Sequence, residues 1–366
     1  MKEDLLRSYM DSFFDSNEQK QRFINAKAID CVYNDNTSAD EWERISDAYK
    51  ALLPYGHLDQ FRLEVGESGS FFIRNIFSRY IDDDTFVVTS RHEHETVKDC
   101  LKAVKHKLEL VYEDIILLDI NSIYDAYVKS GCKKFALYMV GTLIATGEII
   151  PQEFFERLKK KIPDGLYIID DVHGMFITPR DYSMFDAVIY TCHSWVSSFN
   201  MGLIWSRLPD KIGYKSRENT ALYLDLIKVI IGKFDKVRLF KTVLTEFFAA
   251  ELTDNKTYGL FNRTTQHIFA LVTYGLVFTQ EFYDEMFKEC IRFGETLSYR
   301  NFARIRFQEF ILKDPDDAIK ALNRLKQILR FLKQVRDQSG IETVFTGEKN
   351  VTRKHLNDPH GHLDLA

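Results

Sequence analysis

The sequence has no basic segment and no long apolar run. Its 366 residues include 49 Lys and Arg against 54 Asp and Glu, which gives a formal net charge of −5 at pH 7. Binding to nucleic acid or to an anionic membrane surface needs a basic patch, so we expect neither partner. The longest apolar runs, such as FALYMV at 135–140, have the length of a strand and are too short to span a membrane.

The five cysteines are scattered along the chain and form no Cys-x-x-Cys pair. In a chain of this length, such cysteines are typical of the reduced thiols of a cytosolic protein. The N-terminal stretch MKEDLLRSYMDSFFDSNEQKQRF has the pattern of a charged amphipathic helix and lacks that of a signal peptide. We therefore expect a cytoplasmic protein.

Short apolar runs alternate with amphipathic helical patterns between about 60 and 210. This alternation predicts a mostly parallel sheet with helices on both faces. The predicted strands cover 85–90, 108–113, 134–140, 166–172, 185–191 and 200–206, and the predicted helices between them cover 94–108, 120–130 and 151–162.

The alternation of apolar runs and helical patterns ends on both sides of this region. We predict an N-terminal helical segment at 1–50, a large α/β domain at 51–235, and a small α+β C-terminal domain at 236–366 that packs with the N-terminal segment. In the C-terminal part, a helical pattern at 219–252 precedes further helices, a strand at 302–312 and a helix at 315–335.

Ligands of open parallel sheets bind beyond the carboxyl ends of the strands. In the stretch VGESGSFFIRNIF, Gly66, Gly69 and Ser70 directly precede an apolar helix. Free backbone N–H groups at such a helix start bind phosphate when glycines allow it to approach closely. The alternative is an ordinary helix cap.

A second stretch, TSRHEHETV, follows the strand at 85–90. His92 and His94 would serve as metal ligands if a third ligand lay nearby. In the alternative, Glu93 and Glu95 complement the positive end of a helix dipole and the histidines are solvated.

Two further stretches follow later strands. Asp170, Asp171 and His173 end an apolar strand, and a buried carboxylate needs a cation such as a protonated pyridine nitrogen, a metal ion, or an Arg or Lys side chain. His193 and Ser194 follow the next strand, with no Gly-x-Ser-x-Gly motif to indicate a hydrolase.

In type, order and spacing, these four stretches together resemble the class V aminotransferase and cysteine desulfurase family of pyridoxal-phosphate (PLP)-dependent transferases, of fold type I. The resemblance covers most of residues 60–210 and, more loosely, the C-terminal part. It implies an α/β fold with a mostly parallel, doubly wound sheet and a smaller α+β C-terminal domain. It also implies a homodimer with the active site at the interface.

The resemblance gives each stretch a role. Gly69 and Ser70 match the helix start that holds the cofactor phosphate, and His94 matches the histidine that stacks on the pyridine ring. Asp170 matches the carboxylate that pairs with the pyridine nitrogen, and His173 matches a residue near the ring hydroxyl. The phosphate stretch departs from the family where FFIR follows, because family members usually have a hydroxyl residue and a Glu there.

Three further places correspond to the family, the first directly and the other two more loosely. The segment Thr146-Gly147-Glu148-Ile149 corresponds to the TGEI segment between a strand and a helix of the family. Thr220 corresponds to a threonine that reaches the phosphate of the partner subunit. Arg304 or Arg306 would hold a substrate carboxylate, and we expect only one of these two side chains to face inward.

His193 and Ser194 correspond to the family's His-Lys pair, and Gly202 follows Ser194 at the family's spacing (202 − 194 = 8). A serine therefore stands where the family has the lysine that binds the cofactor covalently. Serine cannot form an imine, and its hydroxyl is too weakly basic to carry protons unaided. We expect ordinary transamination or desulfuration to be severely impaired or absent.

Four interpretations remain open. The chain binds PLP or pyridoxamine phosphate (PMP) non-covalently and acts on a small carbonyl or amino-acid-like substrate, with His193, Ser194 and His173 as catalytic candidates. It is a silent subunit that completes or regulates a lysine-bearing paralogous partner. Without PLP, it holds a metal ion between His94, Asp170 and His173. Finally, Ser194 is an engineered replacement of the lysine in an aminotransferase- or desulfurase-like enzyme.

Overall fold

The described part of the chain forms two compact units. The larger unit comprises 25–144 and 149–232, and the smaller one comprises 1–24, 145–148 and 233–366. The domain limits given above from the sequence stay a prediction. The computed structural model describes residues 2–25, 39–66, 68–91, 93–111, 115, 119–143, 149–175, 178–191, 202–213, 228–229, 232–248, 258–260, 268–273, 302–306 and 314–339.

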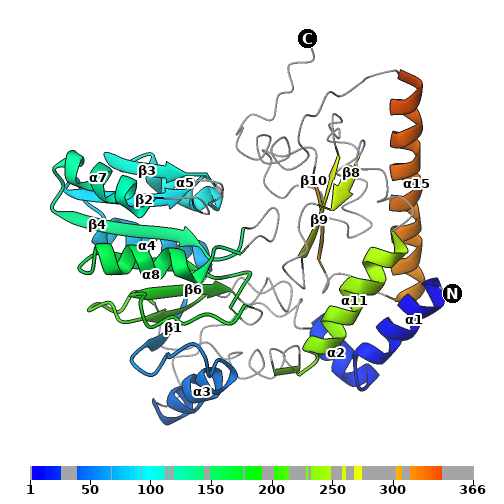
Figure 1. Ribbon diagram of the computed structural model, residues 1–366. Coiled ribbons are helices and arrows are strands. Elements are labelled where there is room, and N and C mark those ends of the chain that lie inside the picture. Colours follow the sequence, from blue (N-terminus) through cyan, green and yellow to red (C-terminus); the bar gives the residue numbers. More distant parts are fainter. Residues whose placement is uncertain are drawn as a thin grey trace. The chain divides into compact units, whose positions relative to one another are not determined.

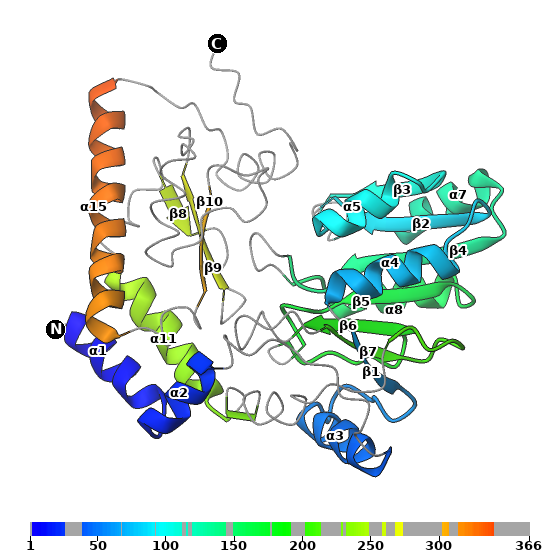
Figure 2. The same ribbon diagram turned by 180° about the vertical axis from the view of Figure 1, so that it is seen from behind.

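The larger unit contains a seven-stranded sheet with the order β1-β7-β6-β5-β4-β2-β3 (Figures 1 and 2). Strand β7 is antiparallel to both of its neighbours, and the other pairs are parallel, as the sequence predicts for most of the sheet. The strands are β1 (Arg62–Gly66), β2 (Thr85–Ser90), β3 (His106–Leu110), β4 (Lys134–Val140), β5 (Leu166–Asp170), β6 (Ala187–Thr191) and β7 (Gly202–Ser206).

Helices cover both faces of this sheet. Figures 1 and 2 show α4 and α8 on opposite faces. Helix α5 packs against α4, and α7 packs against α8, so each face carries one of these pairs. The helices of the larger unit are α3 (Ala39–Leu52), α4 (Gly69–Tyr80), α5 (Glu95–Leu101), α7 (Ile120–Ser130) and α8 (Gln152–Lys161).

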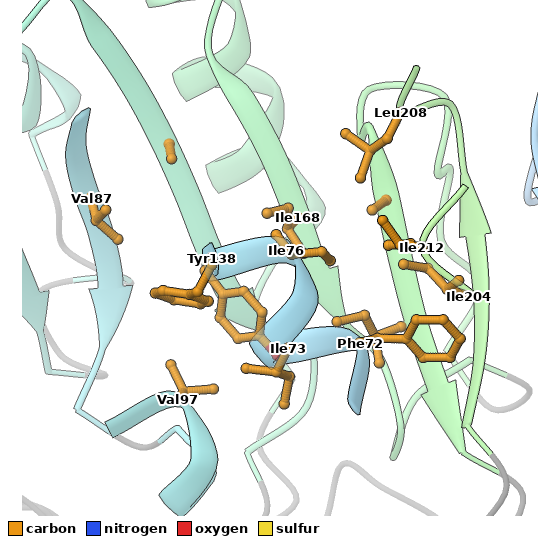
Figure 3. Packing of buried hydrophobic residues seen from close by; sticks show 14 of the residues in the cluster. Phe72, Ile73, Ile76, Val87, Val97, Tyr138, Ile168, Ile204, Leu208 and Ile212 are labelled. Carbon is orange, nitrogen blue, oxygen red and sulfur yellow. The ribbon is translucent and has the colours of Figure 1, made fainter. Parts of the chain in front are cut away.

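The core between α4 and the sheet fixes where α4 begins. Side chains three and four positions apart on α4 face the sheet, and burial of such apolar area is the main stabilising term in folding. Because α4 is held along its length, its first turn stays at the carboxyl edge of the sheet. Figure 3 shows the α4 residues Phe72, Ile73 and Ile76 packed with Val87, Tyr138, Ile168 and Ile204 of four strands.

Several predicted elements are confirmed and others differ. Strands 85–90 and 134–140 and the helix at 120–130 have the predicted bounds. The helix predicted over 94–108 ends at Leu101, because 106–110 pair with β2 as a parallel edge strand. Strand β1 was not predicted; it pairs with β7, which lies about 140 residues further along the chain.

The smaller unit contains a helical layer and a three-stranded antiparallel sheet with the order β10-β9-β8. Helix α1 packs against α11 and α15, with the Tyr9 and Phe240 rings stacked at 5.0 Å between centroids. Strands β8 and β9 lie where the sequence predicts further helices, so that prediction is wrong there. The elements are α1 (Lys2–Phe13), α2 (Asn17–Asn25), α11 (Phe234–Phe247), α15 (Pro315–Ser339), β8 (Tyr258–Leu260), β9 (Ile268–Thr273) and β10 (Phe302–Arg306).

Arg304 and Arg306 are both part of β10, where they pair with Ala270 and Ile268 of β9. Positions two apart along a strand share one face of the sheet. Alternation along β10 therefore does not distinguish these two arginines, and which of them holds a substrate stays a prediction.

None of the helices within the described ranges has both the length and the apolar composition needed to cross a membrane. The longest of them, α15, has 25 residues and carries charged side chains along its whole length.

Candidate active site

The sheet of the larger unit has a switch point between β2 and β4. These strands are neighbours, but β2 continues into α5 on one face of the sheet and β4 leads to α8 on the other. In open α/β sheets, ligands bind in the crevice that such a divergence leaves at the carboxyl ends of the strands. The residues that follow β2, β4 and β5 border this crevice.

The start of α4 and the start of α5 are joined at this edge by hydroxyl groups. Ser68 caps α4, with its Oγ accepting a hydrogen bond from the Phe71 N–H at 3.1 Å. Ser70 Oγ and Thr96 Oγ1 share a hydrogen bond of 2.8 Å. Thr96 also donates its N–H to Nδ1 of His94, the capping residue of α5, at 3.2 Å. Ser70 and His94, predicted separately from the sequence, therefore lie on either side of one threonine.

Two glycines let the start of α4 lie directly on the sheet. A Cβ on Gly202 would be 2.4 Å from the carbonyl carbon and oxygen of Ser68, and a Cβ on Gly69 would be 2.9 Å from Cγ2 of Thr191. The first-turn N–H groups of α4, which have no partners within the helix, are therefore beside the end of β6. The chain that continues from β6 is the segment with the predicted residues His193 and Ser194.

Asp170 ends β5 and is 6% exposed. Its Oδ2 accepts a hydrogen bond from Tyr138 Oη at 3.1 Å, and its Oδ1 accepts one from the Val172 N–H at 3.2 Å. Burial raises the pKa of Asp170 to about 6. Within the described residues, no ion pair includes Asp170, so its charge has no cationic partner from that part of the chain.

Glu93 follows β2 and is 1% exposed. Its Oε1 accepts hydrogen bonds from Ser90 Oγ at 2.8 Å and from the Val140 N–H at 2.9 Å. Its Oε2 is buried and has no hydrogen-bond partner among the described residues. Burial, together with the nearby Asp170 charge, raises the pKa of Glu93 to about 8. One interpretation of the sequence placed Glu93 at the positive end of a helix dipole. In the structure it follows β2, a strand that is buried along its whole length.

Asp171, next to Asp170, has a different environment. Its Oδ2 accepts a hydrogen bond from Tyr182 Oη at 2.6 Å and lies 3.6 Å from Nε of Arg180, whose side chain is 1% exposed. Arg180 Nη2 also donates to the carbonyl oxygens of Gly141 and Ile150 at 3.2 and 3.0 Å. Asp171 therefore has the arginine partner that the sequence analysis considered for this pair of carboxylates, and its role is structural.

The remaining predicted residues fall into three groups: two described histidines of the larger unit, residues outside the described ranges, and two arginines of the smaller unit. His173 is buried in the turn after β5. His94 keeps part of its surface exposed, and burial of the remainder lowers its pKa. The residues His92, Thr146 to Glu148, His193, Ser194 and Thr220 lie outside the described residues, and Arg304 and Arg306 belong to the smaller unit.

The metal interpretation gains no support from this geometry. Among the described side chains, no three His, Cys, Asp or Glu residues are close enough together to hold a metal ion. This applies to His94, Asp170 and His173, which are all described.

Comparison with known proteins gives matches only at the level of structure. No family model matches the sequence, and no curated protein matches it. A NifS-like protein from Rickettsia africae has 12% identity and a TM-score of 0.62, with 87% of this chain and 98% of that chain covered. The SepCysS–SepCysE N-terminal domain complex has 11% identity and a TM-score of 0.61, with 85% and 91% covered. Serine palmitoyltransferase from S. paucimobilis, solved with bound PLP-myriocin aldimine, has 13% identity and a TM-score of 0.59, with 89% and 86% covered.

These matches confirm the predicted fold. The chain has the fold type I α/β architecture of PLP-dependent transferases, with a mostly parallel seven-stranded sheet. At such low identity, the likeness concerns the fold.

Proposed function

We propose that this chain binds PLP or PMP non-covalently at the carboxyl edge of the larger sheet and uses it on a small carbonyl or amino-acid-like substrate. The observation that carries this proposal is Asp170, a buried carboxylate without a cationic partner among the described residues. A protonated pyridine nitrogen supplies both the charge and the N–H that such a carboxylate needs. When bound, the cofactor would supply an electron sink for reactions at the substrate carbon that carries the amine or carbonyl group.

The groups around Asp170 suit the rest of the cofactor. The His94 side chain is exposed at the start of α5, where it would stack on the ring. Ser70 Oγ and the first N–H groups of α4 would hold the phosphate, because the N-terminus of a twelve-residue helix favours an anion. Asp170, in accepting the ring N–H, would keep the pyridine nitrogen protonated.

Ser194 determines how the cofactor would be held. In the family that the sequence resembles, a lysine binds the cofactor covalently and then carries protons. Ser194 can do neither, so binding would depend on non-covalent contacts alone. The proton-carrying role would fall to His173 and His193, because imidazole is a side chain that both accepts and donates protons in general acid–base catalysis.

The oligomeric state also belongs to this proposal. We expect a homodimer in which Thr220 of each protomer reaches the phosphate of its partner. In the runner-up proposal, the chain is a silent subunit that pairs with a lysine-bearing paralogue. The match to a solved SepCysS–SepCysE complex shows that a protein of this fold forms a complex with a second protein.

Titration of the purified protein with PLP and with PMP tests this proposal. We expect a change in the absorbance spectrum of the cofactor and a rise in the unfolding temperature, both reversed by dialysis. Pyridoxine, which lacks the phosphate, is the control and should bind more weakly. If neither phosphate form changes the spectrum or the unfolding temperature, the proposal is wrong; recovery of a stable hetero-oligomer would then favour the silent subunit.

A further inference from the structure

Glu93 is a buried acid at the crevice, and the resemblance gives it no role. We propose that Glu93, in its neutral form, joins the end of β2 to the end of β4 and thereby sets the spacing between His94 and Asp170. It is a positioning residue, since its effect on a ligand passes through these two neighbours. The identity of that ligand rests on the proposed function.

The contacts of Glu93 connect the two sides of the crevice. One carboxyl oxygen, Oε1, accepts hydrogen bonds from Ser90 Oγ at the end of β2 and from the Val140 N–H at the end of β4. Val140 is paired with Asp170 in the register of β4 and β5. His94 directly follows Glu93 in the chain. The position of His94 relative to Asp170 is thus fixed through one side chain and one strand register.

Burial keeps Glu93 in its neutral form. The side chain is 1% exposed, its Oε2 has no partner among the described residues, and within that part of the chain no ion pair includes it. An ionised carboxylate in such surroundings is far more costly than a neutral one. Oε1 accepts both hydrogen bonds, and the carbonyl oxygen of a neutral carboxylic acid is able to accept them.

The titratable groups that face Glu93 act in the same direction. Asp170 on β5 disfavours a second negative charge nearby and contributes to the raised pKa of Glu93. Tyr138 on β4 is within electrostatic reach of Glu93, Asp170 and Cys100 of α5, and its own pKa lies well above the ordinary value. His94, which follows Glu93 in the chain, is a further titratable neighbour among the described residues, and its pKa is lowered. Among the described residues at the crevice, Asp170 is therefore the charged group without a counter-charge, and its charge matches that of a protonated ring nitrogen.

Two variants separate the parts of this proposal. E93Q keeps an oxygen that accepts both hydrogen bonds and stays neutral at every pH, whereas E93A removes the connection between β2 and β4. We expect E93Q to bind PLP and pyridoxal within about threefold of wild type at pH 7, and E93A to bind both roughly tenfold or more weakly. If E93A loses affinity for PLP and for pyridoxal equally, the variant disturbs the contacts with the ring and leaves the phosphate site intact. The control is E95Q, which changes an exposed glutamate two residues away.

The unfolding temperature of the ligand-free protein gives an independent readout. A carboxyl that is neutral in the folded state and ionised in the unfolded state lowers stability as pH rises from about 5 to about 8. Wild type and E95Q should show this decline, and E93Q should show a smaller one.

Each outcome decides the proposal. Wild-type binding by E93A overturns the positioning role, and loss of binding in E93Q equal to that in E93A overturns the neutral form. If wild type binds no PLP, the proposed function fails. The ligand-free pH profiles then decide, because parallel profiles of wild type and E93Q overturn the assignment of Glu93.

Discussion

Asp170 and Asp171 are adjacent in the chain and face opposite sides of the sheet. Tyr138, which donates to Asp170, packs on Phe77 of α4. Arg180, which pairs with Asp171, lies over the Phe155 ring of α8 at 5.1 Å. Adjacent strand positions alternate between the two faces, and the two faces here supply different partners. Asp171 has its cation in Arg180, whereas Asp170 has no cationic partner among the described residues.

The Asp171–Arg180 pair predicts a large loss of stability in R180M. This change leaves the Asp171 carboxylate buried without a cation, which costs about 3–5 kcal/mol in the free energy of unfolding. Urea denaturation measures this loss. The double variant D171N/R180M should recover part of it, because its two substitutions remove an interacting pair. A loss below about 1 kcal/mol in R180M would contradict the ion-pair role.

The hydroxyl of Ser70 predicts a phosphate-specific effect. In S70A, the affinity for PLP should fall about tenfold or more, the value of one hydrogen bond to a charged group, while the affinity for pyridoxal stays unchanged. Fluorescence titration with both compounds checks this. The control S68A removes the cap of α4 and should lower stability by about 1 kcal/mol. Equal losses for PLP and pyridoxal in S70A would place the phosphate elsewhere.

Gly202 predicts that the start of α4 does not tolerate a side chain beneath it. In G202A, the new Cβ would lie 2.4 Å from backbone atoms of Ser68, which cannot move without α4. We expect a loss of about 1–3 kcal/mol in the free energy of unfolding and weaker PLP binding. If thermal unfolding and PLP titration both give wild-type values, the close approach of β7 and α4 is wrong.

The serine at position 194 predicts a gain of covalent binding in S194K. Borohydride reduction after incubation with PLP should add the mass of the cofactor to S194K, and mass spectrometry of the protein reads this out. Wild type should show no such addition at any residue in stoichiometric yield. Stoichiometric labelling of the wild type at another lysine would contradict the non-covalent mode.

The sequence predicted the central strands well because their signal is local. Strands such as 134–140 are continuous apolar runs between turn residues, and the helix at 120–130 ends at Gly131, whose φ of 71° is typical of a helix end. Strand β1 was missed because RLEVG is short and carries two charged residues, and its pairing with β7 joins distant parts of the chain. The end of the helix at 94–108 was wrong because sheet pairing overrode its helical propensity.

The site was predicted in part for a similar reason. Asp170 was found because a carboxylate that ends an apolar strand stands out in a sequence. Its distinction from Asp171 depends on Arg180, whose place is set by the loop after β5. Glu93 was missed since two histidines flank it and its burial depends on contacts with β4.

The dissociation constant of PLP for D170N tests the central claim most directly. We expect D170N to bind PLP at least about thirtyfold more weakly than wild type at pH 7, because an amide cannot balance a protonated ring nitrogen. D186N is the matched control: Asp186 accepts a hydrogen bond from the Tyr167 N–H at 2.8 Å and precedes β6, at the amino edge of the sheet. It should bind as wild type does.

The same variant separates a loss of binding from a loss of folding. Because burial raises the pKa of Asp170 to about 6, its ionisation lowers the stability of the ligand-free wild type as pH rises from about 4 through 6. Ligand-free D170N should therefore be the more stable protein at pH 7, by on the order of 2 kcal/mol. Weaker PLP binding by this more stable variant is the predicted result, and equal dissociation constants for D170N, D186N and wild type would contradict the account.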